Sequence, residues 1–249
     1  MNRWKAPLLS LLCAPLLLAG CSFLTEDDPT VNWDAKQLYD AAKDSMHENQ
    51  ISEAMDYFTK IESRYPFTRL AQQAQVEKAY LMFMDGENAQ ARLACDRFLT
   101  QYPNHELSDY VLYLKAMIIV NEPDGMIARL FYQDIAERDA EACRDAFDTL
   151  HELVTRFPES RYAPDARRRM HELVLAQARN ELNISKYYYV RHAYVASLER
   201  AQNILRDYQQ TPYVDDALAI MRDCYREMGV TDLERDVEKV IEMNPAPKK

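Results

Sequence analysis

Apolar residues recur along this chain with the period of an α-helix, in five frames of the same form. Each frame holds side chains at offsets of 0, 4, 7 and 11 residues, which trace one stripe along a helix. Only Ser197 and Asn244 are polar among these positions, so each frame predicts an amphipathic helix. The frames consist of Ala54, Phe58, Ile61 and Tyr65; Ala91, Cys95, Phe98 and Tyr102; Ala146, Leu150, Leu153 and Phe157; Ser197, Ala201, Ile204 and Tyr208; and Leu233, Val237, Val240 and Asn244.

The spacing of the frames predicts a repeat of helix pairs. Successive frames begin 37, 55, 51 and 36 residues apart, and two of these intervals lie near the period of about 34 residues of tetratricopeptide (TPR) pairs. Each frame is then the second helix of a pair, with Gly86 and Gly229 marking turns inside pairs. The sequence therefore predicts an all-α fold, a right-handed α-solenoid of about five TPR-like helix pairs with a concave groove. The first helices are expected at 34–48, 69–84, 107–121, 160–182 and 212–227.

Two intervals between frames are longer than the repeat requires, and we expect them to extend repeats 3 and 4. Residues 122–139 lie between the helices of the third pair, and residues 183–196 lengthen the fourth pair. The second interval contains four tyrosines. Long elements inserted in an array often serve contacts, but tyrosines also cover the ends of neighbouring helices, and the sequence leaves both readings open. The tyrosines are Tyr187, Tyr188, Tyr189 and Tyr194.

The first residues have the pattern of a secretory signal. Arg3 and Lys5 precede an apolar run over 8–18, which is too short to span a bilayer. The run ends in Leu-Ala-Gly-Cys at 18–21, which resembles the bacterial lipoprotein processing box. The resemblance implies that residues 1–20 are a signal peptide and that Cys21 carries N-acyl and S-diacylglycerol chains. An uncleaved or differently cleaved signal with an incidental cysteine is the alternative.

This processing divides the chain into an anchor and a solenoid. Residues 21–32 are expected to form a lipid-anchored flexible linker, and residues 33–249 the TPR-like solenoid. Ser22, rather than aspartate, indicates the outer membrane. Within the solenoid, the N-terminal groove repeats, the insert and the C-terminal repeats are predicted at 33–121, 122–139 and 140–249.

Composition narrows the classes of function. The chain has a formal charge of −10, or −12 without the signal. An acidic chain without a basic face argues against nucleic acid as a partner, and against electrostatic attachment to anionic lipid. Glycine occurs only four times in 249 residues, which excludes glycine-rich phosphate loops and favours helices.

The sequence offers no motif for catalysis or for a metal. Its five histidines are scattered and none forms H-E-x-x-H, and neither a P-loop nor G-x-S-x-G is present. We therefore predict a protein that is not an enzyme and that has no cofactor besides the covalent lipid. The basic cluster 167–169 is expected to pair with Asp165 and Glu172. The three further cysteines, Cys95, Cys143 and Cys224, are expected to be small buried hydrophobes, although their spacing leaves a disulfide open.

A series of longer motifs resembles the BamD (ComL-type) family, the TPR lipoproteins of the β-barrel assembly machinery of Gram-negative outer membranes. The motifs occur in order over most of the chain and include both irregular intervals. Two departures, a missing proline directly after Tyr208 and the three cysteines, do not change the assignment. The motifs are Leu18 to Cys21; Arg64-Tyr65-Pro66-Phe67; Asp109-Tyr110-Val111-Leu112-Tyr113; Glu137-Arg138-Asp139; Arg156-Phe157-Pro158 with Ser160 and Tyr162; Tyr187-Tyr188 with Arg191 and Ala193-Tyr194-Val195-Ala196; and Asp207-Tyr208 leading into Ala217-Leu218.

The resemblance implies an adaptor on the periplasmic side of the outer membrane. It implies that the C-terminal repeats bind the POTRA region of BamA and the small lipoproteins BamC and BamE. For the BamA contact we expect Arg200, with Arg191 and Tyr188 nearby, since arginine makes directional ion pairs at interfaces. A solvated helix residue is the alternative for Arg200.

The same resemblance implies that the N-terminal groove receives extended segments of unfolded outer membrane proteins. Tyr65, Phe67 and Tyr110 are the candidate contacts, and core packing is the alternative for Tyr65. Two other functions stay open at this point. One is a periplasmic TPR lipoprotein that coordinates peptidoglycan synthesis or envelope constriction, although no heptad run precedes Asp34. The other is an enzyme of the cell wall.

Overall fold

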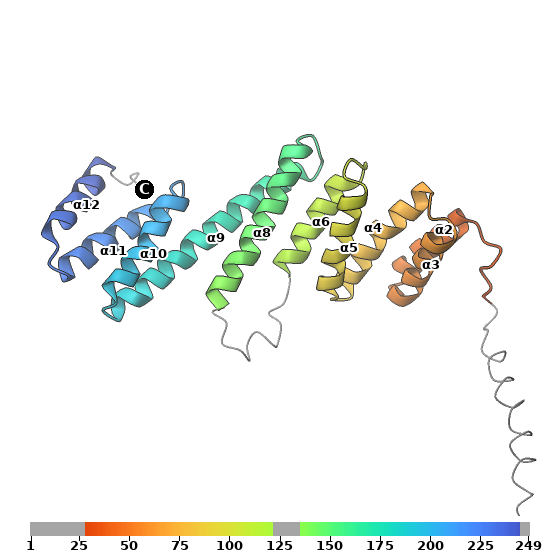
Figure 1. The fold of residues 1–249 in the computed structure, drawn as a ribbon, viewed down its shortest axis with the longest axis horizontal. Coiled ribbons are helices and arrows are strands. Elements are labelled where there is room, and N and C mark those ends of the chain that lie inside the picture. The colour runs from red at the N-terminus through yellow and green to blue at the C-terminus, as the bar shows by residue number, and fades with distance from the viewer. Residues whose placement is uncertain (1–27, 122–134, 245–249) are drawn as a thin grey trace, which may run out of the picture. The chain divides into compact units, whose positions relative to one another are not determined.

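The computed structural model of this chain describes residues 28–121 and 135–244. Within these ranges the regular structure consists of ten helices and no strand, which confirms the all-α class (Figure 1). The expectations for the signal peptide, for Cys21 and for most of the linker fall outside the described residues. The helices are α2 (Ala35–His47), α3 (Ile51–Arg64), α4 (Arg69–Met84), α5 (Asn88–Gln101), α6 (Ser108–Val120), α8 (Ile135–Arg156), α9 (Ala163–Val190), α10 (Tyr194–Asp207), α11 (Val214–Glu227) and α12 (Thr231–Met243).

These helices form five consecutive pairs of the TPR type, with ends within a few residues of most predicted ones. The chain divides into two compact units, one ending at Ala71 and one beginning at Gln72, and each is described by itself. The right-handed winding of the array stays a prediction. One boundary was wrong: α8 begins at Ile135, so residues 135–139 of the expected insert are helical.

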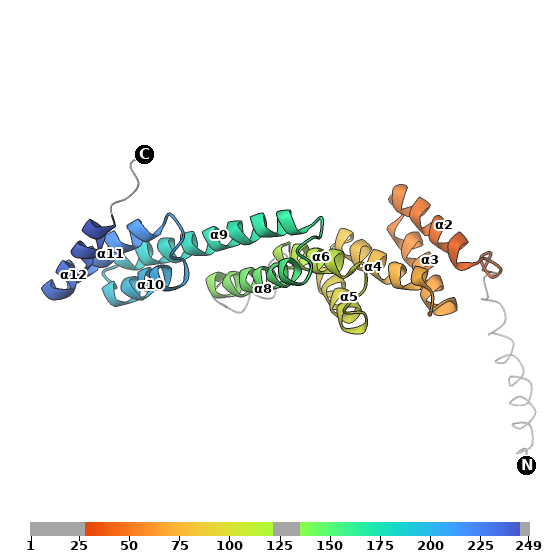
Figure 2. The ribbon, with the colours of Figure 1, turned by 90° about the horizontal axis from the view of Figure 1, so that it is seen from above.

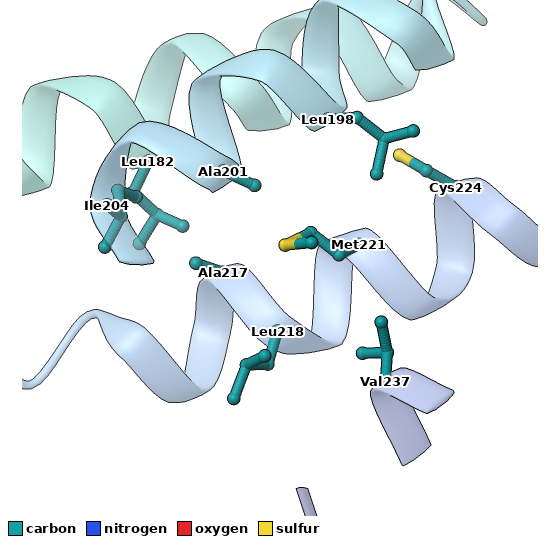
Figure 3. Packing of buried hydrophobic residues seen from close by; sticks show 9 residues of the cluster. All are labelled: Leu182, Leu198, Ala201, Ile204, Ala217, Leu218, Met221, Cys224 and Val237. Carbon is teal, nitrogen blue, oxygen red and sulfur yellow. The ribbon is translucent and has the colours of Figure 1, made fainter. Parts of the chain in front are cut away.

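The buried stripe of each second helix is the common feature of the core. In the second unit, the stripe of α5 packs against residues of α4 and α6. The stripe of α8 packs in the same way against residues of α6 and α9. The stripe of α10 packs against residues of α9 and α11, in the cluster that Figure 3 shows. A second helix is thus covered by the first helix of its own pair and by that of the next pair. The stripe of α12 differs, because only Val237 is buried while Leu233 and Val240 are exposed, and among the described residues no helix follows.

The one polar residue in a covered stripe has a specific partner. Ser197 on α10 is fully buried, and its hydroxyl donates to the carbonyl oxygen of Ser185 on α9 at 2.9 Å. The Ser185 hydroxyl donates in return to the carbonyl oxygen of Ser197 at 2.8 Å. Because both hydroxyls are satisfied, the pair carries no desolvation penalty of an unpaired polar group.

The same turn joins the helices within four of the pairs. One residue in each turn adopts the left-handed conformation, and the next backbone N–H donates to a carbonyl five residues back, as in a Schellman motif. Glycine adopts this conformation without strain, asparagine tolerates it, and histidine is strained there. The left-handed residues are Asn49, Gly86, His192 and Gly229, with φ of 60°, 82°, 61° and 72°.

A second recurring turn joins successive pairs at the aromatic end of each stripe. The carbonyl oxygen of the aromatic residue accepts from the backbone N–H three residues later, at Tyr65, Tyr102, Phe157 and Tyr208 alike. Tyr208 lacks the following proline, yet its carbonyl also accepts from the Thr211 hydroxyl at 2.8 Å. The Thr68 hydroxyl makes the same bond to the Tyr65 carbonyl at 2.8 Å, so the turn forms in the same way with the proline and without it.

Two arginines of the basic cluster at the start of α9, Arg168 and Arg169, are paired as predicted. The carboxylate of Asp165 accepts from Arg169 Nε at 2.6 Å, from Arg168 and from the Tyr113 hydroxyl at 2.7 Å, and Arg168 also pairs with Glu172. These donors hold the pKa of Asp165 well below its ordinary value, the Tyr113 hydroxyl first and the two arginines next. The network links α6 to α9.

Two cysteines in the described residues, Cys95 and Cys224, are free thiols. Cys95 and Cys224 are fully buried, as expected of small hydrophobes, and Cys143 is partly buried. Burial raises the pKa of Cys95 to about 12, so this thiol stays protonated at neutral pH.

The left-handed turns give opposite predictions for two substitutions. Gly229→Ala is expected to destabilise the chain by about 1 kcal/mol, because a Cβ is strained at positive φ although no atom lies within 4 Å of it. His192→Gly is expected to stabilise it by about 0.5 kcal/mol at the equivalent turn, because relief of the strain at positive φ outweighs the loss of the exposed contact between His192 Nδ1 and the Tyr194 hydroxyl. Urea unfolding of both variants measures the two effects, and equal signs would contradict the account of these turns.

The Asp165 network gives a pH dependence. Because its folded pKa lies below the unfolded value, Asp165 contributes stability that is present above the unfolded pKa and is lost as pH falls through the folded pKa. The stability difference between wild type and Asp165→Asn is therefore expected to shrink as pH falls below about 5, and to go on shrinking down to about pH 2. Urea unfolding across that range measures it, with the exposed Asp232→Asn as the control; a difference that grows with acid would contradict the assignment.

Candidate partner-binding site

The fourth pair differs from the others in the length of its first helix. Helix α9 has 28 residues and extends to Val190, so residues 183–190 lengthen this pair as predicted. Both views show α9 running beside α8 and then beside α10 (Figures 1 and 2). The end of α9 and the turn into α10 carry most of the residues expected to contact a partner.

The structure separates the four tyrosines of this segment into two kinds. Tyr189 and Tyr194 pack against the core cluster of the fourth and fifth pairs. Tyr187 is 53% exposed, and Tyr188 is partly buried with its ring at an edge-to-face angle to that of Tyr187. The packing reading therefore applies to Tyr189 and Tyr194, whereas the contact reading stays a prediction for Tyr187 and Tyr188.

An exposed group of apolar and basic side chains surrounds Tyr187. The guanidinium of Arg191 lies 4.3 Å from the centre of the Tyr187 ring, in a cation–π contact. Val190 and Val195, on either side of the turn, are 75% and 73% exposed. An aromatic ring, an arginine and exposed valines together are typical of protein interfaces rather than of solvated helix ends.

His192 holds the turn of this surface in its strained conformation. Its Nδ1 lies 2.8 Å from the hydroxyl of Tyr194, and that hydroxyl donates to Glu227 of α11 at 3.4 Å. Partial desolvation and Glu227 raise the pKa of Tyr194, so its hydroxyl keeps its proton. Through Tyr194 and Glu227, hydrogen bonds connect this turn to α11, the first helix of the fifth pair.

Arg200 lies in the middle of α10 and is partly buried. Its Nη1 donates to Oε1 of Glu181 on α9 at 3.2 Å, and Oε2 of the same carboxylate accepts from Asn203 at 3.1 Å. The side chain of Arg200 is 38% exposed and that of Glu181 only 16%. Arg200 is thus paired within the chain, while part of its surface remains accessible.

The three residues expected at this contact fall into two places. Tyr188 and Arg191 lie together at the end of α9, whereas Arg200 pairs with Glu181, about two and a half turns before that end. Tyr188 follows Glu181 by seven residues, which places both on one side of α9, about 10 Å apart along the axis. They share one side of the pair without a direct contact.

The expected substrate contacts have different environments. The Tyr65 hydroxyl donates to the carbonyl oxygen of Trp33 at 2.7 Å, which supports the packing role for this residue. Phe67 is 98% exposed in the turn before α4. Tyr110 belongs to the other unit, so a groove that joins it to Tyr65 and Phe67 stays a prediction.

Sequence reasoning missed the neighbours of Tyr110. The ring of Tyr162 lies 5.6 Å from that of Tyr110 and 5.0 Å from that of Tyr113, and the Arg161 guanidinium lies 4.7 Å from the Tyr162 ring. Burial raises the pKa of Tyr110. The spacing of Tyr110 and Tyr113 on one helix face was the available signal, but Tyr162 comes from another pair.

Two features are absent from the parts of the chain that the structure describes, a metal centre and a membrane-spanning helix. No group of histidine, cysteine, aspartate and glutamate residues there is arranged to hold a metal ion. No helix in 28–121 or 135–244 is both long and apolar enough to cross a membrane.

Comparisons with known proteins agree with the motifs in the sequence. A protein of Neisseria meningitidis serogroup B, "Outer membrane protein assembly factor BamD", is 39% identical over 86% of this chain and 80% of its own length. Proteins of the same name from Xylella fastidiosa (Temecula1) and Vibrio cholerae are 31% and 30% identical, over 94% and 97% of this chain and 80% and 99% of their own lengths.

Solved structures add little. The crystal structure of MamA protein aligns with 86% of this chain and 97% of its own length at 10% identity, with a TM-score of only 0.34.

The family model described as "YfiO: Outer membrane lipoprotein" matches residues 32–240. This chain therefore belongs to the YfiO family of outer membrane lipoproteins.

Proposed function

We propose that this protein is a non-enzymatic scaffold of the complex that assembles β-barrel proteins into the outer membrane. The relatives named as outer membrane protein assembly factors, up to 39% identical over most of the chain, support this role. In this proposal lipid chains on Cys21 hold the protein at the periplasmic side of the outer membrane. The helix pairs provide surface for partners and no reactive centre.

We propose further that the C-terminal repeats bind the POTRA region of BamA. One observation supports this proposal. On the outward side of the fourth pair, which we define by these three residues, Tyr188 and Arg191 lie at the end of α9 and Arg200 remains partly accessible. A directional guanidinium beside aromatic rings fits an interface hot spot. BamC and BamE are proposed as further partners of these repeats.

The N-terminal repeats are proposed to receive extended segments of unfolded outer membrane proteins. Phe67 is the best supported contact, because a phenylalanine that is 98% exposed contributes nothing to the core. Tyr110 offers a partly accessible ring among other tyrosines. Tyr65 contributes to substrate binding only indirectly in this proposal, by positioning the turn that carries Phe67, because its hydroxyl already donates to the carbonyl oxygen of Trp33.

Charge reversal at position 200 tests the BamA contact. Arg200→Glu is expected to reduce the BamA that co-purifies with the lipidated protein from mild detergent by about tenfold or more, because it removes a donor and places two carboxylates together. Mass spectrometry of the purified complex measures the loss.

Arg92→Glu is the matched control for this experiment. Arg92 is a partly accessible arginine in a 2.9 Å ion pair between helices, with Asp145, away from the fourth pair. If BamA co-purifies equally with both variants and with wild type, Arg200 is not part of the contact. If wall-synthesis proteins co-purify with wild type instead of BamA, the assembly role itself is contradicted.

The proposed anchor gives a separate prediction. Cys21→Ser is expected to abolish acylation and to release the protein from the outer membrane fraction, because each buried CH₂ of the lipid is worth about 0.8 kcal/mol and no acyl chain remains. Membrane fractionation and the intact mass of the protein measure both effects. Cys143→Ser should leave both unchanged, and membrane retention of a Cys21→Ser protein without lipid would contradict the proposed anchor.

A further inference from the structure

A polar seam runs between α9 and α10 in the fourth pair. From α9 it contains Gln177 and Glu181, which lie one turn apart on the same side of the helix. From α10 it contains Arg200, Asn203 and, just beyond the helix, Tyr208. The Tyr208 hydroxyl donates to Gln177 Oε1 at 2.6 Å, and Glu181 accepts from the other two residues.

Glu181 is the centre of this seam. Its side chain is 16% exposed, and each of its two carboxylate oxygens accepts one hydrogen bond from α10. A largely buried ion pair contributes little net stability, because desolvation offsets most of the Coulomb attraction, and an apolar pair of similar volume would hold two helices equally well. Helix packing alone therefore does not explain a carboxylate at this position.

The geometry of Arg200 suggests what the carboxylate does. Among the described residues the guanidinium donates only through Nη1, to Glu181, and its other N–H groups have no acceptor within 28–121 or 135–244. An unpaired arginine samples many rotamers, whereas one paired at a single nitrogen samples fewer and keeps the rest of its planar fork available to donate. The amide of Asn203 uses both of its ends: its Nδ2 donates to Glu181, and its Oδ1 accepts from Arg206 at 2.7 Å.

We infer that Glu181 is a positioning residue for partner recognition, which acts by holding Arg200 so that the unbound edge of its guanidinium faces an acceptor on the partner. This inference rests on the proposed function of the C-terminal repeats. Glu181 is too buried to be the main contact itself. Recognition would then depend on a pair of residues from two helices rather than on a single exposed arginine.

A double-mutant cycle separates positioning from a merely structural role. The variants are Glu181→Gln, Arg200→Ala and the double variant, and the probe is the purified POTRA region of BamA titrated into the full lipidated protein in detergent. Glu181→Gln is expected to weaken binding about tenfold in the wild-type background, because Arg200 loses its fixed orientation. In the Arg200→Ala background it is expected to change binding by less than about twofold, since nothing is left to position.

The outcomes are distinguishable from one another. Equal losses from Glu181→Gln in both backgrounds would show that it acts through the fold and would overturn the inference. Tighter binding by Glu181→Gln would show that Glu181 competes with the partner for Arg200, and would overturn it as well. Absence of any binding by the wild-type protein would contradict the proposed BamA contact instead.

Two controls accompany the cycle. Asp145→Asn removes the carboxylate from the Arg92 ion pair of another repeat, and is expected to leave binding unchanged. Thermal unfolding of each variant shows whether it is folded at the temperature of the titration. A binding loss by Asp145→Asn equal to that by Glu181→Gln would also count against a specific role for Glu181.

Discussion

The burial of one apolar stripe on each second helix is the constraint on which this molecule depends. In the second unit the stripes of α5, α8 and α10 are covered by first helices on two sides, and each contains a fully buried alanine. No pair can bury its stripe alone. Stability is therefore shared between neighbouring pairs, and a side chain that does not face a stripe is free to serve contacts.

The fourth pair shows how this freedom produces a candidate surface. The lengthened α9 keeps Tyr189 and Tyr194 in the core, which fixes the end of the helix and the following turn. Tyr187 and Arg191 then point outward on a rigid support. The strained His192 in this turn is consistent with a surface selected for contact as well as for stability.

Much of the fold could be predicted from the sequence because it depends on local periodicity. The stripes, the first helices and the turns at Gly86 and Gly229 follow from spacing and from glycine chemistry. Ser197 looked like an exception in its stripe, and only the tertiary structure supplies Ser185, twelve residues earlier, as its partner. The start of α8 was missed because turn residues at 122–125 precede it without a clear helix signal.

The candidate site was less predictable, because it depends on contacts between helices. Arg200 and Glu181 are nineteen residues apart, and no local pattern joins them. The four tyrosines of residues 183–196 look alike in the sequence, yet the helical phase sends two inward and Tyr187 outward. Tyr162 joins Tyr110 only because two repeats meet.

Site-specific cross-linking in intact cells tests the central claim most directly, that the outward side of the fourth pair contacts BamA. A photoreactive residue replaces Tyr187 in one strain and Leu93, which is 61% exposed on α5, in another. The account predicts a cross-link to the POTRA region of BamA from position 187 and none from position 93. Equal cross-linking from both positions, or none from position 187, would contradict it.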